Sequence, residues 1–311
     1  MSSEMKRSRK KKKKWPKVAG LIFLLLIIAG CAYGFSVYHS LTRAVETMHR
    51  PIDRETGKRT KELTLSQDEP FSVLILGVDE REGDRGRSDT MIVLAVNPET
   101  ESVRMLSIPR DTRTEIVGHG TTDKINHAYA FGGIEMSMDT VEHFLDIPVD
   151  YYMQINMEGF KDIVDAVGGI TVNNDLDFTY EGVHFNKGNI TLDGEKALKY
   201  SRMRYEDPRG DYGRQLRQRQ IIQEVINEGA SVSTLANYGD IFSALGKNVK
   251  TNLAFNEMIE IQQNYRAAAK KVDQLTIEEK GTKINGVYYG IVSDEEKLKI
   301  QNEMKVQLGI K

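Results

Sequence analysis

Five arginines stand at the predicted ends of secondary-structure elements. Guanidinium groups bind phosphate oxygens in pairs and keep their charge at any working pH. Arginines with a purely structural role have no special reason to collect at such positions, so the pattern favours a site for an anion. The five are Arg87, Arg110, Arg202, Arg204 and Arg214.

Two acids stand close to the first of these arginines. Asp79 follows the apolar run Phe71–Val78, and Asp89 leads into the next run, Met91–Val96. Ligands of layered α/β domains bind where strands end, and Mg²⁺ takes one or two carboxylates together with water and substrate phosphate. The two acids could therefore hold a divalent ion against a diphosphate. The alternative is a solvated loop in which they pair with neighbouring arginines.

The stretch Tyr200–Gln220 combines charge with apolar periodicity. If Tyr200–Arg204 is extended, Arg202 and Arg204 project to the same side. A turn then leads into a helix that we expect to begin near Asp211, with unpaired N–H groups and a positive dipole end in its first turn. One face of this helix is polar at its start and apolar further on; it reads Arg214, Gln218, Ile221, Ile222 and Val225. That face suits a ligand with an anionic head and an apolar tail, although solvated arginines above ordinary core isoleucines remain the alternative.

Strand and helix patterns alternate along the main part of the chain. Continuous apolar runs predict strands covered on both faces at Phe71–Val78, Met91–Val96 and Ser102–Ile108. Pro109 cannot donate to a central ladder, so the third strand should end there and deliver Arg110 to the same edge. We expect further helices at 126–145, 157–167, 241–246, 255–268 and 294–308, and further strands at 151–154, 170–173 and 272–277. This alternation indicates a layered α/β or α+β domain.

The first 38 residues differ in composition from the remainder. Residues 1–17 hold nine Lys or Arg and one Glu, and residues 18–38 are 21 residues without a charge, the length that a helix needs to cross a bilayer. Since the positive flank stays in the cytoplasm, we expect a basic cytoplasmic tail (1–17), a single-pass transmembrane signal anchor (18–38), an extracytoplasmic stalk (39–70) and an outer domain (71–311). The run Ile28–Cys31 also resembles a lipoprotein processing box, which would anchor the chain through Cys31 instead.

Several other functions lack their motifs. The chain has no Gly-x-x-x-x-Gly-Lys-Ser/Thr loop, its six histidines have no zinc-ligand spacing, and its one cysteine lies in the apolar segment. A basic tail of 17 residues is too short for a folded DNA-binding module. We therefore expect no nucleic acid among the partners.

The charged motifs carry a resemblance to a known family. In chain order they are Gly77-Val-Asp79, Arg87-Ser-Asp89-Thr90-Met91, Ser107-Ile-Pro109-Arg110-Asp111, Lys124-Ile-Asn126-His127-Ala128-Tyr129, Gly168-Gly169-Ile170, Tyr200-Ser-Arg202-Met-Arg204 and Asp211-Tyr-Gly-Arg214-Gln-Leu-Arg-Gln218. Together they resemble the LytR-CpsA-Psr family of Gram-positive cell-wall enzymes from about Phe71 to Gly229. Many separate motifs agree, which makes the resemblance specific.

The resemblance implies a fold and an activity. The fold would be a single α/β/α layered domain with a central mixed sheet, a polyprenyl tail in an apolar tunnel and its pyrophosphate among arginines at the mouth. The activity would be an extracytoplasmic phosphotransferase that moves a glycopolymer, wall teichoic acid by expectation, from a polyprenyl-pyrophosphate carrier to a muramic acid hydroxyl of peptidoglycan. Polyprenyl phosphate would be released. A membrane-tethered protein that binds such precursors without turning them over is the alternative.

The resemblance also assigns residues to roles. Asp79 and Asp89 match the acids associated with Mg²⁺ (or Mn²⁺). The phosphate-binding positions match Arg87, Arg110, Arg202, Arg204, Arg214 and Gln218, and the catalytic positions match Arg110, Arg202, Arg204, Asp211 and Arg214. Ile221, Ile222 and Val225 would contact the lipid tail. For the base that accepts the proton of the hydroxyl the candidate is Asp211, with Asp89 or direct loss to water as alternatives.

Overall fold

The computed structural model describes residues 63–79, 86–229 and 248–310, together with His39, Gly246 and the positions 42–43, 45–52, 54, 58–59 and 61. The predicted tail (1–17), membrane anchor (18–38) and, apart from Gly246, the helix at 241–246 lie outside the described residues. Within the described residues, no helix has both the length and the apolar character to span a bilayer. The described part of the predicted stalk packs on the domain, since Val45 and Met48 are buried against Val249.

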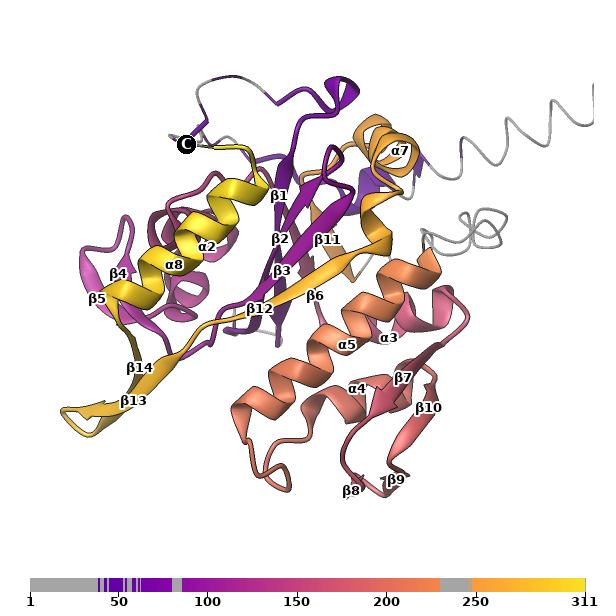
Figure 1. The fold of residues 1–311 in the computed structure, drawn as a ribbon, viewed down its shortest axis with the longest axis vertical. Coiled ribbons are helices and arrows are strands. Elements are labelled where there is room, and N and C mark those ends of the chain that lie inside the picture. Colours follow the sequence, from indigo (N-terminus) through magenta and orange to yellow (C-terminus); the bar gives the residue numbers. More distant parts are fainter. Residues whose placement is uncertain are drawn as a thin grey trace, which may run out of the picture.

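A six-stranded mixed sheet forms the centre of the domain (Figure 1). Its order is β11 (Val249–Thr251), β6 (Tyr151–Ile155), β1 (Phe71–Val78), β2 (Ser88–Asn97), β3 (Ser102–Ser107) and β12 (Val272–Thr276). β1 and β6 are parallel, as are β3 and β12, whereas β1–β2, β2–β3 and β6–β11 are antiparallel. The predicted mixed sheet is confirmed, and 272–277 forms its edge as expected.

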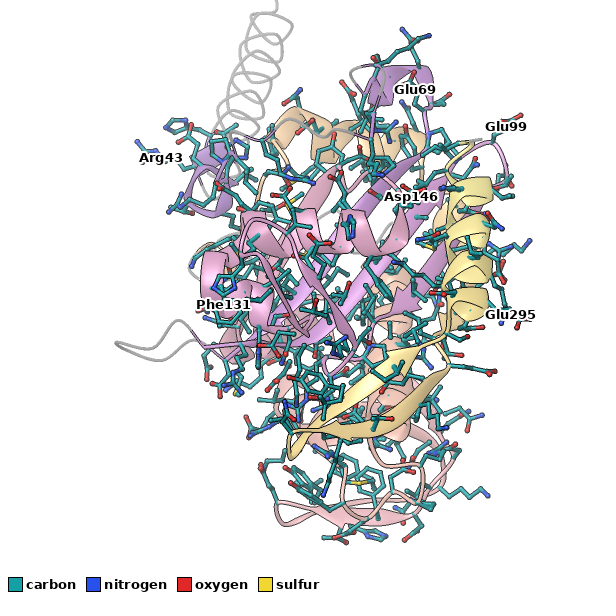
Figure 2. All side chains as sticks on the ribbon, turned by 90° about the vertical axis from the view of Figure 1, so that its left-hand side faces the viewer. Arg43, Glu69, Glu99, Phe131, Asp146 and Glu295 are labelled. Atoms are coloured by element: carbon teal, nitrogen blue, oxygen red, sulfur yellow. The ribbon has the colours of Figure 1, made fainter. Side chains whose placement is uncertain are left out.

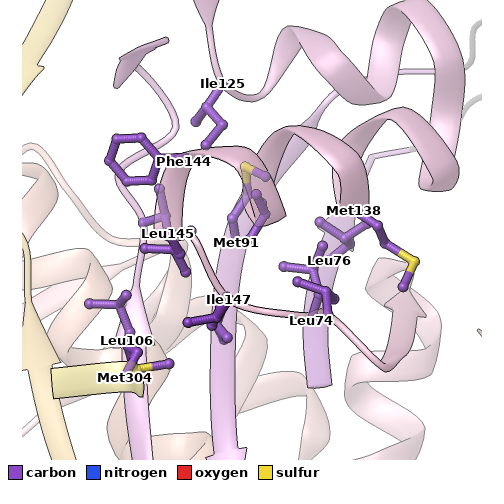
Figure 3. Close-up of a cluster of buried hydrophobic side chains, with 14 of the residues drawn as sticks. Leu74, Leu76, Met91, Leu106, Ile125, Met138, Phe144, Leu145, Ile147 and Met304 are labelled. Atoms are coloured by element: carbon purple, nitrogen blue, oxygen red, sulfur yellow. The ribbon is translucent and has the colours of Figure 1, made fainter. Parts of the chain in front are cut away.

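Helices cover both faces of this sheet, which explains why its central strands are apolar without interruption. Leu74 and Leu76 of β1 point to one face, and Val73 and Ile75 point to the other. The first face packs against α2 (His127–Leu145) and α8 (Asp294–Gln307), with Met138, Phe144, Leu145 and Met304 among the contacts (Figure 3). The second face packs against α5 (Asp211–Gly229), α7 (Phe255–Asn264) and the short helix η3 (Ala268–Lys270). The predicted α/β/α layering is therefore confirmed.

A smaller lobe stands beside the sheet, between β6 and α5 in the sequence. It contains α3 (Met157–Ala166), α4 (Gly194–Arg202), and the hairpins β7–β10 (Ile170–Asn174, Gly188–Leu192) and β8–β9 (Phe178–Tyr180, Val183–Phe185). Its core is separate and includes Val164, Phe178, Tyr200 and Ile221. The strand expected near 170–173 therefore exists, but it belongs to this lobe rather than to the central sheet.

Two hairpins beside the strand ends carry no strong sequence signal and were not predicted: β4–β5 (Arg113–Ile116, Thr121–Lys124) and β13–β14 (Glu279–Ile284, Val287–Val292). The backbone N–H of Gly290 donates to Asp111 O at 2.9 Å, which fastens β14 to the loop after β3. Earlier in the chain, the 3₁₀-helix η1 (Leu65–Gln67) precedes β1. Lys305 of α8 pairs with Asp146, which directly follows α2. Figure 2 labels Asp146 and, on α8, Glu295.

The expected extended conformation of Tyr200–Arg204 is wrong. Residues up to Arg202 belong to α4, which Asp193 begins by accepting a hydrogen bond from the Lys196 N–H at 2.8 Å. Ala197 and Tyr200 bury one side of this helix. Tertiary packing of an amphipathic helix therefore overrides the period-two reading, and Arg202 and Arg204 reach their positions from a helix end and the loop after it.

Candidate functional site

A cavity of about 390 Å³ lies where the sheet meets the smaller lobe. The carboxyl end of β1, the start of β2, and helices α3, α4 and α5 all contribute to its wall. Six charged side chains that the sequence pointed to line it: Asp79, Asp89, Arg110, Arg202, Arg204 and Arg214. Residues up to 135 positions apart in the chain, from Asp79 to Arg214, thus meet at one place.

A β-bulge aims Asp89 into this cavity. Gly77 pairs with Thr90 and Val78 pairs with Ser88, so Asp89 is the extra residue between the two pairs. Such bulges re-aim side chains at sheet edges. Gly77 is required here because a Cβ at this position would lie 2.9 Å from the Cβ of Thr90. The glycine of the Gly77-Val-Asp79 motif therefore has a steric role beside the site.

Arg110 joins the Asp89 carboxylate to the loop after β3. Its Nη1 donates to Asp89 Oδ1 at 2.7 Å, and its Nε lies 3.7 Å from Asp111 Oδ2. Asp111 is also held by Lys124 Nζ at 2.6 Å. Burial lowers the pKa of Arg110, but the hydrogen bond and charge of Asp89, with the charges of Asp111 and Asp211, outweigh burial and leave the pKa raised. Arg110 is therefore a permanent cation in the site.

The first turns of α5 bring further charged residues, Asp211 and Arg214, next to Arg110 and Asp89. Arg214 Nη2 lies 2.7 Å from Asp211 Oδ1, and Gln215 Nε2 donates to Asp211 Oδ2 at 2.9 Å. Burial lowers the pKa of Arg214, while Asp211 opposes the shift and Arg110 adds to it. The Nε atoms of Arg110 and Arg214 are buried without a hydrogen-bond partner among the described residues. Buried donors of this kind favour an anionic ligand, because leaving them unpaired costs free energy.

The cavity changes from polar to apolar along α5. Arg214, Gln218 and Ile222 all line it at intervals of four residues, so the side chains on one helix face span roughly 12 Å. Ile222 packs in one apolar cluster with Ile75 and Ile155, which also line the cavity, and Phe160 and Leu198 are further apolar residues of its wall. An anionic head at Arg214 and an apolar chain toward Ile222 fit this gradient.

The end of α4 completes the charged rim. Both Arg202 and Arg204 line the cavity. The Arg202 side chain is 44% exposed and its Nη1 lies 3.8 Å from Glu181 Oε1. The Arg204 guanidinium lies 5.5 Å from the ring centroid of Tyr205, a side chain that is 90% exposed. These two arginines are held loosely by their own side-chain contacts, so their backbone positions decide where their charges lie.

Four of the residues singled out from the sequence do not line the cavity: Arg87, Asp211, Ile221 and Val225. Arg87 is exposed and does not line the cavity. Ile221 is 0% exposed in the core of the smaller lobe, and Val225 packs against the same core. Of the three predicted lipid contacts, only Ile222 lines the cavity. Asp211 lines a small void of about 10 Å³ directly behind the charged end, together with Asp89, Arg110, Arg214 and Gln218.

Other wall residues were not predicted. Asn156 and Phe160 of the α3 region, Tyr180 and Tyr205 also line the cavity. The Asn156 side chain accepts from the Gly159 N–H at 2.8 Å and so caps α3, a role visible in sequence as an Asn before a helix. Tyr205 directly follows Arg204, and that adjacency was its only signal. Phe160 reads as an ordinary core position, which offers no means of assigning it to a cavity.

The fold and the site define a class: an α/β/α domain whose sheet edge holds a cavity, charged at one end and apolar at the other. The chain matches the model of the LytR_cpsA_psr family over residues 35–306, and it belongs to this family.

Named relatives cover almost the whole chain. It is 50% identical over 305 residues to the "Polyisoprenyl-teichoic acid--peptidoglycan teichoic acid transferase TagU" of Bacillus subtilis (strain 168), spanning 98% of this chain and 99% of the relative. The crystal structure of B. subtilis TagU superposes with a TM-score of 0.64 at 51% identity, covering 78% of this chain and 98% of that one. A structure described as "TagT bound to LIIa-WTA" superposes with a TM-score of 0.73 at 32% identity, covering 84% of this chain and 100% of that one.

Proposed function

We propose that this chain is a phosphotransferase that moves a wall glycopolymer from a polyprenyl-pyrophosphate carrier to a hydroxyl of peptidoglycan. The observation that carries the proposal is the cavity, which is lined by four arginines, two acids and several apolar side chains. Asp89, Arg110, Arg204 and Arg214 lie within electrostatic reach of one another, whereas Ile75, Ile155 and Ile222 belong to one apolar cluster. The names of the relatives support teichoic acid as the polymer and peptidoglycan as the acceptor. The family resemblance is our basis for the other three parts of the proposal: the carrier, the muramic acid hydroxyl and the release of polyprenyl phosphate.

To catalyse the transfer, the protein must position the reacting groups and stabilise negative charge. The oxygen of the acceptor hydroxyl attacks the phosphorus that carries the glycan, the bond from that phosphorus to the second phosphate breaks, and polyprenyl phosphate leaves. Negative charge develops on the phosphate oxygens during this exchange, and preorganised guanidinium groups stabilise it. Arg110 and Arg214 approach from the sheet and from α5, while Arg202 and Arg204 approach from the end of α4. The diphosphate would thus be enclosed from several sides.

A divalent cation, Mg²⁺ or Mn²⁺, fits the donor set at the same end. Asp79 and Asp89 both line the cavity, and two carboxylates plus substrate phosphate and water satisfy Mg²⁺. These two residues would hold the ion, which would neutralise part of the phosphate charge when bound. The Asp89 carboxylate keeps its hydrogen bond to Arg110 on one oxygen, so its other oxygen remains for a ligand.

Asp211 is our candidate for the group that accepts the proton of the hydroxyl. Arg214 and Gln215 orient its carboxylate beside the charged end. Gln215 hydrogen-bonds Oδ2, while Oδ1 is paired with Arg214 but accepts no hydrogen bond among the described residues. Direct loss of the proton to water is the alternative route. Gln218 would contribute an uncharged hydrogen-bonding group to the diphosphate from the next turn of α5.

The N-terminal segment completes the proposal. A basic tail at 1–17 and an apolar anchor at 18–38 would hold the domain on the outer side of the cell membrane, where both the lipid carrier and peptidoglycan are available. The long lipid and the anchored domain would then share one surface.

The proposal is tested with the purified full-length chain, Mg²⁺, a polyprenyl-pyrophosphate glycan and peptidoglycan fragments. We expect transfer by the wild type and a loss of about 10²- to 10³-fold in Arg110→Ala or Arg202→Ala, because each removes a charge-stabilising donor. Arg113→Ala is the control, since Arg113 is exposed on β4 and outside the cavity wall. Binding of the lipid without any turnover would instead support a tethered precursor-binding protein.

A further inference from the structure

Asp207 and Arg217 form an ion pair in which both side chains are buried. Arg217 Nη1 donates to Asp207 Oδ2 at 2.6 Å, and the two side chains are 1% and 0% exposed. Neither residue lines the cavity. Asp207 lies in the loop between α4 and α5, and Arg217 lies on α5 itself.

Arg217 fastens the end of α4 to α5. Its Nε donates to Tyr200 O at 3.0 Å, and its Nη2 donates to Met203 O. The guanidinium lies 5.4 Å from the ring centroid of Phe178 and 5.8 Å from that of Tyr200. One side chain therefore holds two backbone carbonyls on either side of Arg202, and the second of them belongs to Met203, which directly precedes Arg204.

Asp207 holds the rest of the loop. Its carboxylate accepts hydrogen bonds from the Arg209 N–H at 2.9 Å and from Arg209 Nε at 2.9 Å. Arg209 Nη1 in turn lies 2.6 Å from Asp175 Oδ2. Burial would raise the pKa of Asp207, but the hydrogen bonds from Arg209 and Arg217 outweigh burial and hold it well below its usual range. A Cβ at Gly213 of α5 would overlap this carboxylate, so the glycine lets α5 approach the loop.

We propose that the Asp207–Arg217 pair is a positioning device that sets where Arg202 and Arg204 present their charges to the substrate diphosphate. Buried ion pairs add little net stability compared with apolar residues of similar volume, so stability alone does not account for this arrangement. The side chains of Arg202 and Arg204 have only loose contacts of their own. Their placement therefore follows the backbone that the pair ties down. The inference rests on the proposed function, because it assigns the pair a role in diphosphate binding.

The test uses the full-length double variant Asp207→Asn with Arg217→Met. Replacing both members leaves no unpaired charge in the core, while the ties to Tyr200 O and Met203 O are lost. We expect a melting temperature lowered by only a few degrees, because Tyr200 O and Met203 O lose their donors, and a Kd for geranylgeranyl pyrophosphate raised about 10-fold or more. We also expect transfer to fall by up to about 10²-fold, as misplacement of binding groups by 1 Å can cause.

A second variant acts on the same pair from α5. Gly213→Ala keeps both charges and displaces Asp207, so it should also raise the Kd. Gly229→Ala is its control, because a Cβ at the far end of the same helix meets no atom of the described residues within 4 Å. Wild-type binding and transfer in both the double variant and Gly213→Ala would overturn the inference. A double variant that melts far below the wild type, with normal binding by Gly213→Ala, would make the pair a stability element and overturn it too. A wild type that neither binds the probe nor transfers glycan would refute the proposed function itself.

Discussion

Asp89 Oδ1 accepts a hydrogen bond of 2.7 Å from Arg110 Nη1, across the ends of two neighbouring strands. The contact exists because Asp89 is the bulged residue of β2 and Arg110 follows the end of β3. Asp89, which could bind a cation, and Arg110, which could bind a phosphate, therefore lie side by side at the strand ends. The position depends on a tight backbone approach between Gly77 and Thr90.

Gly77→Ala should disturb this position without changing any charged residue. The new Cβ would lie 2.9 Å from Thr90 Cβ, closer than such atoms pack, so the bulge that carries Asp89 must shift. We expect transfer to fall by up to about 10²-fold and the free energy of unfolding to fall by about 1 to 3 kcal/mol. Gly229→Ala serves as the control. Unchanged transfer in Gly77→Ala would show that the bulge geometry is unimportant.

Removal of divalent ions should stop the reaction. Chelation with EDTA is expected to abolish transfer, and added Mg²⁺ or Mn²⁺ should restore it, because Asp79 and Asp89 supply two carboxylates to the cavity. Asp79→Asn should raise the Mg²⁺ concentration needed for half-maximal transfer, whereas Asp294→Asn, on the exposed start of α8, should not. Full activity in EDTA would rule out the metal.

Ile222→Phe should shorten the apolar part of the cavity. Ile222 lines the wall two turns beyond Arg214, where a lipid tail would pass. We expect weaker binding of a long polyprenyl pyrophosphate and nearly unchanged binding of a short one, measured as a ratio of Kd values. Ile259→Phe on the exposed side of α7 is the matched control. Equal loss for short and long lipids would contradict a tail path along α5.

Asp146 should make stability depend on pH at acidic values. Hydrogen bonds from Lys305 and Lys58 lower the pKa of Asp146 from 3.8 to about 2. A lowered pKa in the folded state stabilises the fold above pH 3.8, and this contribution is lost as pH falls toward 2. Asp146→Asn should therefore lower the melting temperature by roughly 1 to 3 °C at pH 7, since the side chains are partly exposed. The difference should shrink below pH 4.

The Asp146 comparison has a built-in structural control. Asp146 has a positive φ of 53°, which Asn also adopts readily. Glu99→Gln, in an exposed turn, should show no difference at either pH. A melting-temperature difference for Asp146→Asn that is the same at pH 7 and pH 3 would remove the electrostatic explanation.

Local signals in the sequence were enough for the main strands of the central sheet and for the helices α2, α3, α5, α7 and α8. The apolar runs of β1, β2 and β3 identify buried strands because both faces of each strand must be covered. Gly168 and Gly169 mark the end of α3 through positive φ angles of 88° and 85°, which side chains with a Cβ disfavour. Their places at the predicted ends of strands and helices pointed to Asp79, Asp89, Arg110 and Arg214, the family motifs matched them, and all four line one cavity.

Tertiary structure decided which side each residue faces. Ile221 and Ile222 are neighbours with the same side chain, yet one is buried in the smaller lobe and the other lines the cavity. Arg202 and Arg204 reach the site from a helix end rather than from a strand, because Tyr200 and Ala197 pack into a core formed by distant residues. Periodicity records only which positions are apolar, whereas the partner that buries them comes from another part of the chain. The sequence alone therefore determined the central strands, the long helices and the chemistry of the site, whereas long-range packing determined the conformation of α4 and the walls of the cavity.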